Sequence, residues 1–225
     1  SVAATERLIV YTSIDGTGTS YQGDTNKGVY IYGAQIEAGS YPTSYIPTSG
    51  SAVTRAAEIA NGAGTSDDFN DSEGVLYIES AALTDEAVDK RIAISNGTMS
   101  NYVSIGYSRF SGNIIAEMYS GGVLQTLNWG ANGVTQANNN KFALSWGGGT
   151  MKFYVNGTQT NTESATSPVG INRLDFSTAI GGLRMSAKTK EVAVFKTALT
   201  DTELESLSSW DSFSDMATGQ LYSIK

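Results

Sequence analysis

KFALSW, at Lys141–Trp146, and MKFYV, at Met151–Val155, are the stretches that decide the fold. In both, large apolar residues alternate with smaller or polar ones, and this period of two places the large residues on one face of a β-strand. The three glycines between them supply the turn, because glycine adopts the positive φ angles of tight hairpin turns without steric cost. Asn156-Gly157 gives a second turn signal directly afterwards. We therefore predict antiparallel hairpins whose large residues face a hydrophobic core.

The rest of the chain repeats this pattern of short apolar runs and frequent turns. Gly, Ser, Thr and Asn make up two in five residues, which favours strands joined by turns over helices. Runs rich in Val, Ile, Tyr and Phe recur about every ten residues, as in a sandwich or barrel. One short helix is predicted after Thr200, because Thr200 as N-cap and Glu203 form a capping box. The predicted strands are Arg7–Thr12, Gly28–Glu37, Gly74–Leu83, Lys90–Ser95, Tyr102–Tyr107, Asn113–Tyr119, Val123–Asn128, Lys141–Trp146, Met151–Val155, Thr158–Glu163, Arg173–Phe176 and Glu191–Lys196.

The composition of the 225 residues excludes several classes of chemistry. The chain has no Cys, which excludes disulfides, thiolate nucleophiles and Cys-based zinc sites. It has no His, which excludes a Ser-His-Asp triad and an imidazole metal ligand. A net charge of −8 argues against a nucleic acid as partner, because its phosphates repel an acidic surface. No apolar run reaches the roughly 18 residues of a membrane span, so we expect no membrane insertion.

The chain is predicted to divide at about Thr48–Thr65. Ser49-Gly50-Ser51 and Asn61–Gly64 have the composition of loops. The first residues, SVAATE, have neither the basic region nor the apolar stretch of a signal peptide. They read as a cut end, so we expect the chain to be a fragment of a longer protein. The tail Trp210–Lys225 is too apolar for a free tail, and we expect it to pack on another surface.

The first part of the chain resembles a segment common in bacteriophage tail-fibre and structural proteins. The resemblance rests on GVYIYGAQIEAG at Gly28–Gly39, PTSYIPT at Pro42–Thr48 and AVTRAAE at Ala52–Glu58. It implies that residues 1–50 are the terminal strands of an upstream jelly-roll-like module and that 51–65 are a linker. A half module leaves an unpaired sheet edge. Three explanations of this edge stay open. The segment packs on the domain that follows it in the same chain, it pairs with copies from other subunits in a homotrimer, or it is the remnant of a trimmed module.

The remainder, residues 66–225, resembles the concanavalin A-like, laminin G-like lectin/glucanase superfamily. The central hairpin matches at Lys141–Trp146 and Lys152–Gly157, and the closing strand and helix match at Lys190–Phe195 and Ala198–Leu204. The resemblance implies an all-β fold, an antiparallel β-sandwich (concanavalin A-like jelly roll) with one short C-terminal helix. It says little about activity, because this sandwich hosts lectins, hydrolases, lyases and adhesion modules.

Catalysis is not expected. Glycoside hydrolysis needs two carboxylates facing one another across the bond, roughly 5–10 Å apart. The glucanases of this superfamily carry them as E-x-D-x-x-E on one strand, a motif that this chain lacks. The nearest acidic cluster, Asp85–Asp89, has the wrong spacing and reads as a solvated turn. The related alginate lyases use a His, which is also absent.

No cofactor is required by any motif, although a structural calcium ion is possible. Calcium takes carboxylate and carbonyl oxygens, usually about 6–8 of them. No spacing typical of an EF-hand occurs, so the metal ligands stay unknown. The loop carboxylates available to such an ion are Asp67, Asp68, Asp71, Asp85, Asp89 and Asp175.

A loop of Asn and Gly around Trp129 has the chemistry of a glycan site. Sugars present hydroxyls and apolar ring faces, so their sites combine exposed aromatic rings with amide or carboxylate groups. Trp129 lies beside Asn132, and Asn138 follows a few residues later. Trp129 is equally suited to closing one end of the sandwich core.

The strand Tyr102–Tyr107 adds two further aromatic candidates. Tyr102 and Tyr107 are five residues apart, so they lie on opposite faces, and we expect one in the core and the other exposed. Arg109, in the following turn, suits contact with a charged sugar, although a solvated turn residue explains it more simply.

These observations favour a receptor-binding module of a phage tail fibre. It is expected to recognise a host cell-surface polysaccharide or glycan non-covalently, and its location is then the virion, outside the cell. Three alternatives stay open: a structural or trimerisation spacer of the fibre without ligand, a polysaccharide depolymerase, and a bacterial surface adhesin.

Overall fold

The computed structural model describes residues 26, 30–35, 44–47, 49–51, 53–54, 59–83, 87–110, 112–128, 134–212 and 214–215. The chain divides into two compact units, Ser1–Ala57 and Glu58–Lys225, and the division falls inside the segment 51–65. Within the described residues, no helix has the length and apolar character needed to cross a membrane.

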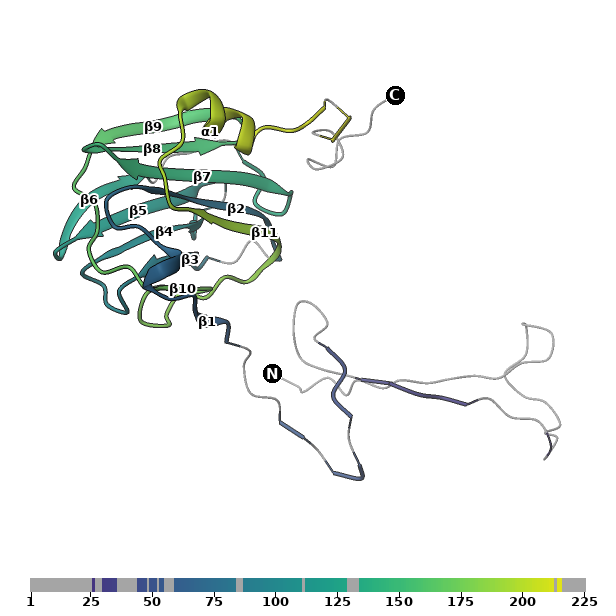
Figure 1. Cartoon of the computed structure of the whole chain (residues 1–225). Helices are drawn as coiled ribbons and strands as arrows, with labels where there is room; N and C mark the ends of the chain where they lie inside the picture. The colour runs from purple at the N-terminus through teal and green to yellow at the C-terminus, as the bar shows by residue number, and fades with distance from the viewer. Residues whose placement is uncertain are drawn as a thin grey trace. The chain divides into compact units, whose positions relative to one another are not determined.

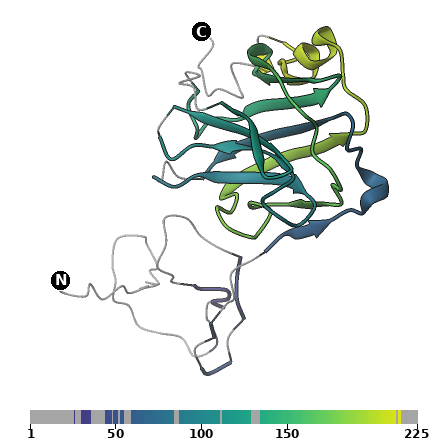
Figure 2. The same cartoon turned by 90° about the vertical axis from the view of Figure 1, so that its left-hand side faces the viewer.

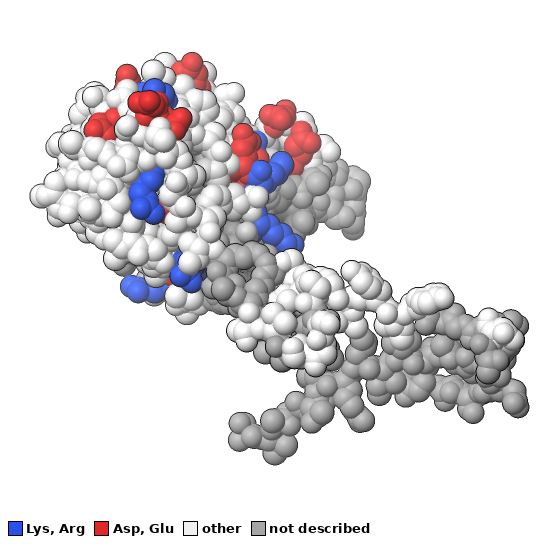
Figure 3. Space-filling model, turned by 60° about the horizontal axis from the view of Figure 1, so that its bottom comes forward, with Lys and Arg blue, Asp and Glu red and all other residues white. Residues whose placement is uncertain are grey.

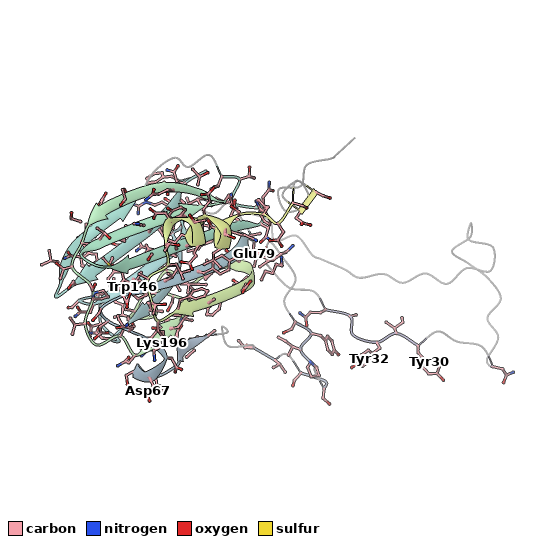
Figure 4. All side chains as sticks on the ribbon, turned by 45° about the horizontal axis from the view of Figure 1, so that its top comes forward. Tyr30, Tyr32, Asp67, Glu79, Trp146 and Lys196 are labelled. Atoms are coloured by element: carbon pink, nitrogen blue, oxygen red, sulfur yellow. The ribbon has the colours of Figure 1, made fainter. Side chains whose placement is uncertain are left out.

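The described part of the N-terminal unit is held by contacts between residues 30–35 and 44–47. The Gln35 Oε1 atom accepts a hydrogen bond from the Ile46 backbone N–H at 2.8 Å. Two tyrosines of this unit are almost wholly exposed, Tyr30 at 102% and Tyr32 at 89% (Figure 4). The prediction of a strand at Gly28–Glu37 is wrong for residues 30–35, which have no ladder partner among the described residues. The rest of that run and Arg7–Thr12 lie outside the described residues.

The described residues of the C-terminal unit form a sandwich of short strands with the helix α1 after the last strand (Figure 1). Its strands begin and end within a few residues of the predicted bounds. Asn61–Ala63 also forms a strand, although its composition predicts a loop. The strands are β1 (Asn61–Ala63), β2 (Gly74–Ala82), β3 (Lys90–Ser95), β4 (Tyr102–Tyr107), β5 (Ile114–Ser120), β6 (Val123–Asn128), β7 (Asn140–Gly147), β8 (Thr150–Val155), β9 (Thr158–Ser164), β10 (Arg173–Asp175) and β11 (Ala187–Phe195).

The strands form two sheets that lie one over the other (Figure 2). The six-stranded sheet has the order β1-β10-β3-β4-β5-β6, and the five-stranded sheet has the order β11-β2-β7-β8-β9. All of these pairings are antiparallel. The predicted fold, an antiparallel jelly-roll β-sandwich with one short C-terminal helix, is therefore confirmed.

The core lies between the sheets and includes the hairpin that decides the fold. In β7 and β8, Phe142 pairs with Val155 and Trp146 pairs with Met151. Every second side chain of the hairpin enters one apolar cluster, as the period of two predicts, and Trp146 is only 1% exposed (Figure 4). Each fully buried large side chain contributes about 1.5–3 kcal/mol relative to an exposed one. The opposite wall of the cluster consists of Ile92, Ile94, Val103, Ile105, Tyr107, Ile114, Ala116 and Met118.

A 3₁₀-helix, η1 (Ser66–Asp68), lies between β1 and β2. The end of β11 fixes it, because Lys196 Nζ donates to the Asp67 carbonyl oxygen at 2.6 Å (Figure 4). Asn70 Nδ2 also donates to the Lys196 carbonyl oxygen at 2.8 Å. Segments far apart in the sequence are therefore joined at this end of the sandwich.

The helix α1 (Asp201–Ser208) begins with the predicted capping box. The Thr200 Oγ1 atom accepts from the Glu203 backbone N–H at 3.4 Å, and Glu203 Oε2 accepts from the Thr200 backbone N–H at 2.8 Å. Two of the N–H groups at the helix start are thus satisfied by side chains. Hydrogen bonds from Thr200 lower the pKa of Glu203 below its ordinary value of 4.5.

We expect loss of this cap to lower the thermal stability of the protein by an amount that depends on pH. A carboxyl whose pKa is lower in the folded state stabilises the fold above its unfolded pKa, and the effect disappears as pH falls through the folded pKa. We expect Glu203→Gln to lower the melting temperature by a few degrees at pH 7 and to have less effect at pH 3. Thermal unfolding at both pH values checks this. An equal effect at pH 3 and pH 7 would contradict the role of the ionised carboxylate.

Candidate functional site

The outer face of the five-stranded sheet is closed by α1 and the segment after it. Leu204 of α1 is fully buried against Val75, Tyr77, Ala143 and Tyr154. Figure 4 shows the helix in front of this sheet, and its contacts run to β7, β8 and β9. Because the helix covers this face, we look for a binding surface on the other sheet.

The outer face of the six-stranded sheet carries mostly polar and charged side chains from the neighbouring strands β10, β3, β4 and β5. Side chains alternate along a strand, so the residues between the core positions of β3, β4 and β5 point outward. Register places Ser104 opposite Glu117 and Tyr102 opposite Tyr119. We call this set the outer polar face, and it consists of Arg91, Ala93, Ser95, Tyr102, Ser104, Glu117, Tyr119, Arg173 and Asp175.

A buried ion cluster around Arg91 occupies the middle of the outer polar face. Arg91 Nη1 donates to the Glu117 carboxylate, and Arg91 Nη2 lies 3.4 Å from Asp89 Oδ2. The three side chains are each 10% exposed or less. Asp89 Oδ1 also accepts from the Arg109 backbone N–H at 2.8 Å. Buried charges persist only when they are paired, so this cluster fixes the side chains of three segments relative to one another.

A second ion pair lies within β10 on the same face, and its carboxylate also binds the backbone of β1. Arg173 is bidentate on Asp175, with Nε to Oδ2 at 2.9 Å and Nη2 to Oδ1 at 2.7 Å. Asp175 is fully buried and also accepts from the Gly62 backbone N–H at 2.7 Å. The Arg173 side chain is 35% exposed, so its guanidinium is held in one orientation while its edge faces solvent.

Two tyrosine rings stack beside these pairs. Tyr102 and Tyr119 have ring centroids 5.0 Å apart and an interplanar angle of 15°. Tyr102 is only 1% exposed, and burial raises its pKa well above the usual range. Tyr119 is half-buried, so it is the tyrosine of this pair that can be reached from solvent.

Two hollows are lined by residues next to strands of the same sheet, and Arg184 contributes to both. One has a volume of about 360 Å³ and is lined by Val88, Asp89 and Leu183 among others. The other, of about 450 Å³, is lined by Ile59 and neighbouring residues, and Arg184 lines both. Ligand pockets in proteins usually have volumes of about 300–1,000 Å³, so each hollow is large enough for a small ligand.

Charged side chains are sparse on the face of the molecule that Figure 3 shows. Figure 3 shows a face on which most atoms belong to uncharged residues and the charged side chains form small separate groups. Only 16% of the residues are charged. Few neighbouring charges therefore compete with or screen a single unpaired cation on this surface, fewer than on an average protein surface.

The structure places the aromatic candidates of the sequence differently from the prediction. Tyr102 and Tyr107 lie on opposite faces of β4 as predicted, but both are buried, at 1% and 0% exposed. The expected exposure of one of them is wrong, because the outer polar face buries its own central side chains. Tyr107 donates to the Ser80 carbonyl oxygen at 2.5 Å, and burial raises its pKa to about 12. Trp129 and Asn132 lie outside the described residues.

The two polar candidates lie in loops at the same end of the sandwich. Arg109 is exposed, with its guanidinium 5.3 Å from the centre of the Phe110 ring. Asn138 is half-buried, and its backbone N–H donates to the Thr135 carbonyl oxygen at 3.0 Å. Gln136 joins the two loops, because its Nε2 atom donates to carbonyl oxygens of the loop at 108–113 at 2.8–3.1 Å. Loop 108–113 therefore also meets the Arg91 cluster, through the Arg109–Asp89 hydrogen bond.

Several residues that build these features were not singled out from the sequence. Arg91 and Glu117 each lie next to apolar residues of a strand. A charged residue at such a position indicates a paired charge on the outer face of the sheet, so the sequence did contain a signal for this cluster. Arg173 begins the predicted strand Arg173–Phe176 and Arg184 lies in turn-rich sequence. Nothing in the sequence distinguishes either residue from a solvated charge.

No group of three or more carboxylates suited to a metal ion occurs among the described residues. Several of the carboxylates considered for calcium have other partners: Asp71 accepts from the backbone N–H groups of Gly170 and Ile171, and Asp175 binds Arg173. Asp85 lies outside the described residues. A calcium ion stays a prediction.

No protein-family model matches this chain, and no curated protein matches it. Solved structures do match, and several of them share a lectin-like β-sandwich. The CBM40 of the Ruminococcus gnavus IT-sialidase matches with a TM-score of 0.55 and 16% identity, over 68% of this chain and 96% of that one. A SAP-like pentraxin from Limulus polyphemus matches with a TM-score of 0.52 and 13% identity, over 68% of this chain and 76% of that one.

A third match is to part of a larger enzyme. The NanB sialidase of Streptococcus pneumoniae matches with a TM-score of 0.51 and 19% identity, over 66% of this chain but only 28% of that one. At these identities the likeness concerns the fold alone. The chain thus has the jelly-roll sandwich of carbohydrate-binding modules and pentraxins, consistent with the concanavalin A-like fold that the sequence resembles.

Proposed function

We propose that the C-terminal unit is a carbohydrate-binding module that holds a glycan without chemical change. The observation that carries this proposal is the outer polar face, where Arg173 and Tyr119 offer a fixed guanidinium and a reachable ring on rigid strands. Sugars are bound by planar hydrogen-bonding groups together with aromatic rings, and these two side chains lie in one row across the sheet. Groups held on strands by buried partners need little reordering on binding, which favours affinity.

The fold likeness supports this proposal. The Ruminococcus gnavus CBM40 has also been solved bound to α2,3 and α2,6 sialyllactose, and those structures match with TM-scores of 0.54 and 0.52 at 18% and 16% identity. The buried carboxylates of the outer polar face speak against hydrolysis as the alternative. Glu117 and Asp89 share one guanidinium and are nearly inaccessible, so they do not face one another across an open cleft.

The same module is proposed to act at the surface of a phage virion, in a tail fibre that captures host polysaccharide. This part rests on the segments Gly28–Gly39, Pro42–Thr48 and Ala52–Glu58, whose sequence resembles that of tail-fibre proteins. The exposed tyrosines Tyr30 and Tyr32 support association of residues 1–57 with further copies, as in a homotrimer. Several weak sites on one fibre would then act together and raise the effective affinity.

Retention on immobilised bacterial polysaccharides, followed by a glycan array, tests the binding function with the full chain. We expect retention without any increase in reducing ends or unsaturated products. Appearance of products would favour the depolymerase alternative. A folded chain that is retained on no polysaccharide and no array glycan would leave the spacer alternative. Sedimentation velocity of the same sample tests the trimer, and a monomer at all concentrations would contradict it.

A further inference from the structure

The loop that carries Arg184 is rigid and comes from the connection between β10 and β11. Its turn is closed by Thr178, whose backbone N–H donates to the Gly182 carbonyl oxygen at 2.8 Å and whose Oγ1 accepts from the Gly182 N–H at 3.1 Å. Gly181 N–H also donates to the Thr178 carbonyl oxygen at 2.9 Å. The next residue, Leu183, has a φ of +47°, which is rare for a residue with a Cβ.

This strained residue is held in place by β3. The Leu183 carbonyl oxygen accepts from the Arg91 backbone N–H at 3.0 Å, and Arg91 forms a parallel bridge with Arg184. Strained residues of this kind persist where the surroundings over-determine them, and they cluster at ligand sites. As a result, Leu183 lines the smaller hollow with 40% of its surface exposed, and Arg184 lines both hollows.

Arg184 brings a positive charge to both hollows, although the chain as a whole is acidic. Arg184 is exposed, and its guanidinium has no hydrogen-bond or ion-pair partner in the part of the chain that the structure describes. Among the described residues, the one carboxylate that lines either hollow is Asp89, which shares the Arg91 guanidinium with Glu117. Lys90 also lines the smaller hollow, where its Nζ atom donates to the Val88 carbonyl oxygen at 3.5 Å.

Apart from Ser186 and Asn61, the other side chains that line the hollows are apolar. Val88 is 48% exposed beside Leu183 in the smaller hollow, and Ile59 is 61% exposed in the larger one. Met185 and Phe176 line the larger hollow as well. The two hollows therefore combine one unpaired guanidinium with aliphatic and aromatic side chains. This combination suits a ligand with a planar anion on an otherwise apolar ring face.

We propose that Arg184 and its two hollows bind the carboxylate of an acidic sugar, so that the module prefers glycans with carboxylated residues. This inference rests on the proposed carbohydrate-binding function and names the substrate class. The guanidinium pairs with the carboxylate, while the sugar ring lies against Leu183 on one side or against Ile59 on the other. Neutral sugars lose the charged contact and bind more weakly at this place.

A glycan array that carries uronic-acid and sialic-acid glycans beside their neutral counterparts tests the inference. We expect the full chain to bind carboxylated glycans, and Arg184→Gln to bind them about 10-fold to 100-fold more weakly, because hydrogen bonds to charged groups are the strong ones. Lys188→Gln is the matched control, since it removes one exposed charge from β11 and should bind like the unchanged chain. Arg184→Lys should recover part of the affinity. Circular dichroism should show equal folding of all variants, because both side chains are exposed.

The outcomes separate this inference from the function on which it rests. Binding to neutral glycans alone would overturn the acidic-sugar inference and leave the binding function intact. Binding to no glycan at all would overturn the function itself. Equal binding of carboxylated glycans by Arg184→Gln and the unchanged chain would place the site elsewhere and overturn the assignment of Arg184.

Discussion

The Gly106→Ala variant is expected to lose at least about 4 kcal/mol of its free energy of unfolding, an effect at the extreme of single substitutions. Gly106 lies in β4 and pairs with Arg91 of β3. A Cβ atom at this position would lie 1.8 Å from the Lys90 carbonyl oxygen and 2.9 Å from the Arg91 Cα atom. These are backbone atoms of the neighbouring strand, so no side-chain rotation relieves the overlap.

Relief would require β3 to move away from β4. That movement would break the β3–β4 ladder, shift β10 on the other side of β3 and open the core at Ile92 and Ile105. Chemical unfolding followed by tryptophan fluorescence measures the loss. Gly148→Ala is the matched control, because Gly148 has a φ of +60° and nothing lies within 4 Å of its added Cβ. It should cost only about 1–2 kcal/mol of backbone strain. Equal losses for the two variants would contradict the close approach of the strands.

Local signals in the sequence predicted most of the sandwich. The β7–β8 hairpin and the capping box at Thr200 depend on residues a few positions apart, and both are confirmed. The strand β1 was missed because its partner is remote: Asn61 pairs with Asp175, and the loop-like composition of Asn61–Ala63 gives no periodicity to read. Pairing energy from a distant strand thus overrides local composition.

The candidate site was less accessible to such reasoning. Alternation correctly placed Tyr102 and Tyr107 on opposite faces of β4, but alternation cannot say whether an outward face is covered by its own neighbours. The Arg91 cluster requires the register of three strands and the loop position of Asp89, none of which the sequence states. The position of Arg184 depends on the turn at Thr178–Gly182 and on the hydrogen bond that joins Leu183 to β3. Neither of them can be read from the sequence.

Removal of the Arg91 side chain is the second large effect that we expect. Arg91→Met keeps the apolar stem but leaves the carboxylates of Glu117 and Asp89 buried without their cation. Breaking a buried ion pair from one side costs about 3–5 kcal/mol, because the charge left behind is neither solvated nor paired. We therefore expect a loss of this size in the free energy of unfolding, measured by urea denaturation at pH 7.

Two comparisons isolate the buried charge as the cause. Arg91→Met combined with Glu117→Gln removes a stranded charge together with its cation, so the double variant should be more stable than Arg91→Met alone. Lys152→Met breaks the ion pair with Asp201, whose side chain is 62% exposed, and should cost no more than about 1 kcal/mol. If Arg91→Met costs as little as Lys152→Met, solvent reaches the cluster and the outer polar face is not rigid. The glycan would then meet groups that must be ordered on binding, and the affinity expected from a preformed face would be lost.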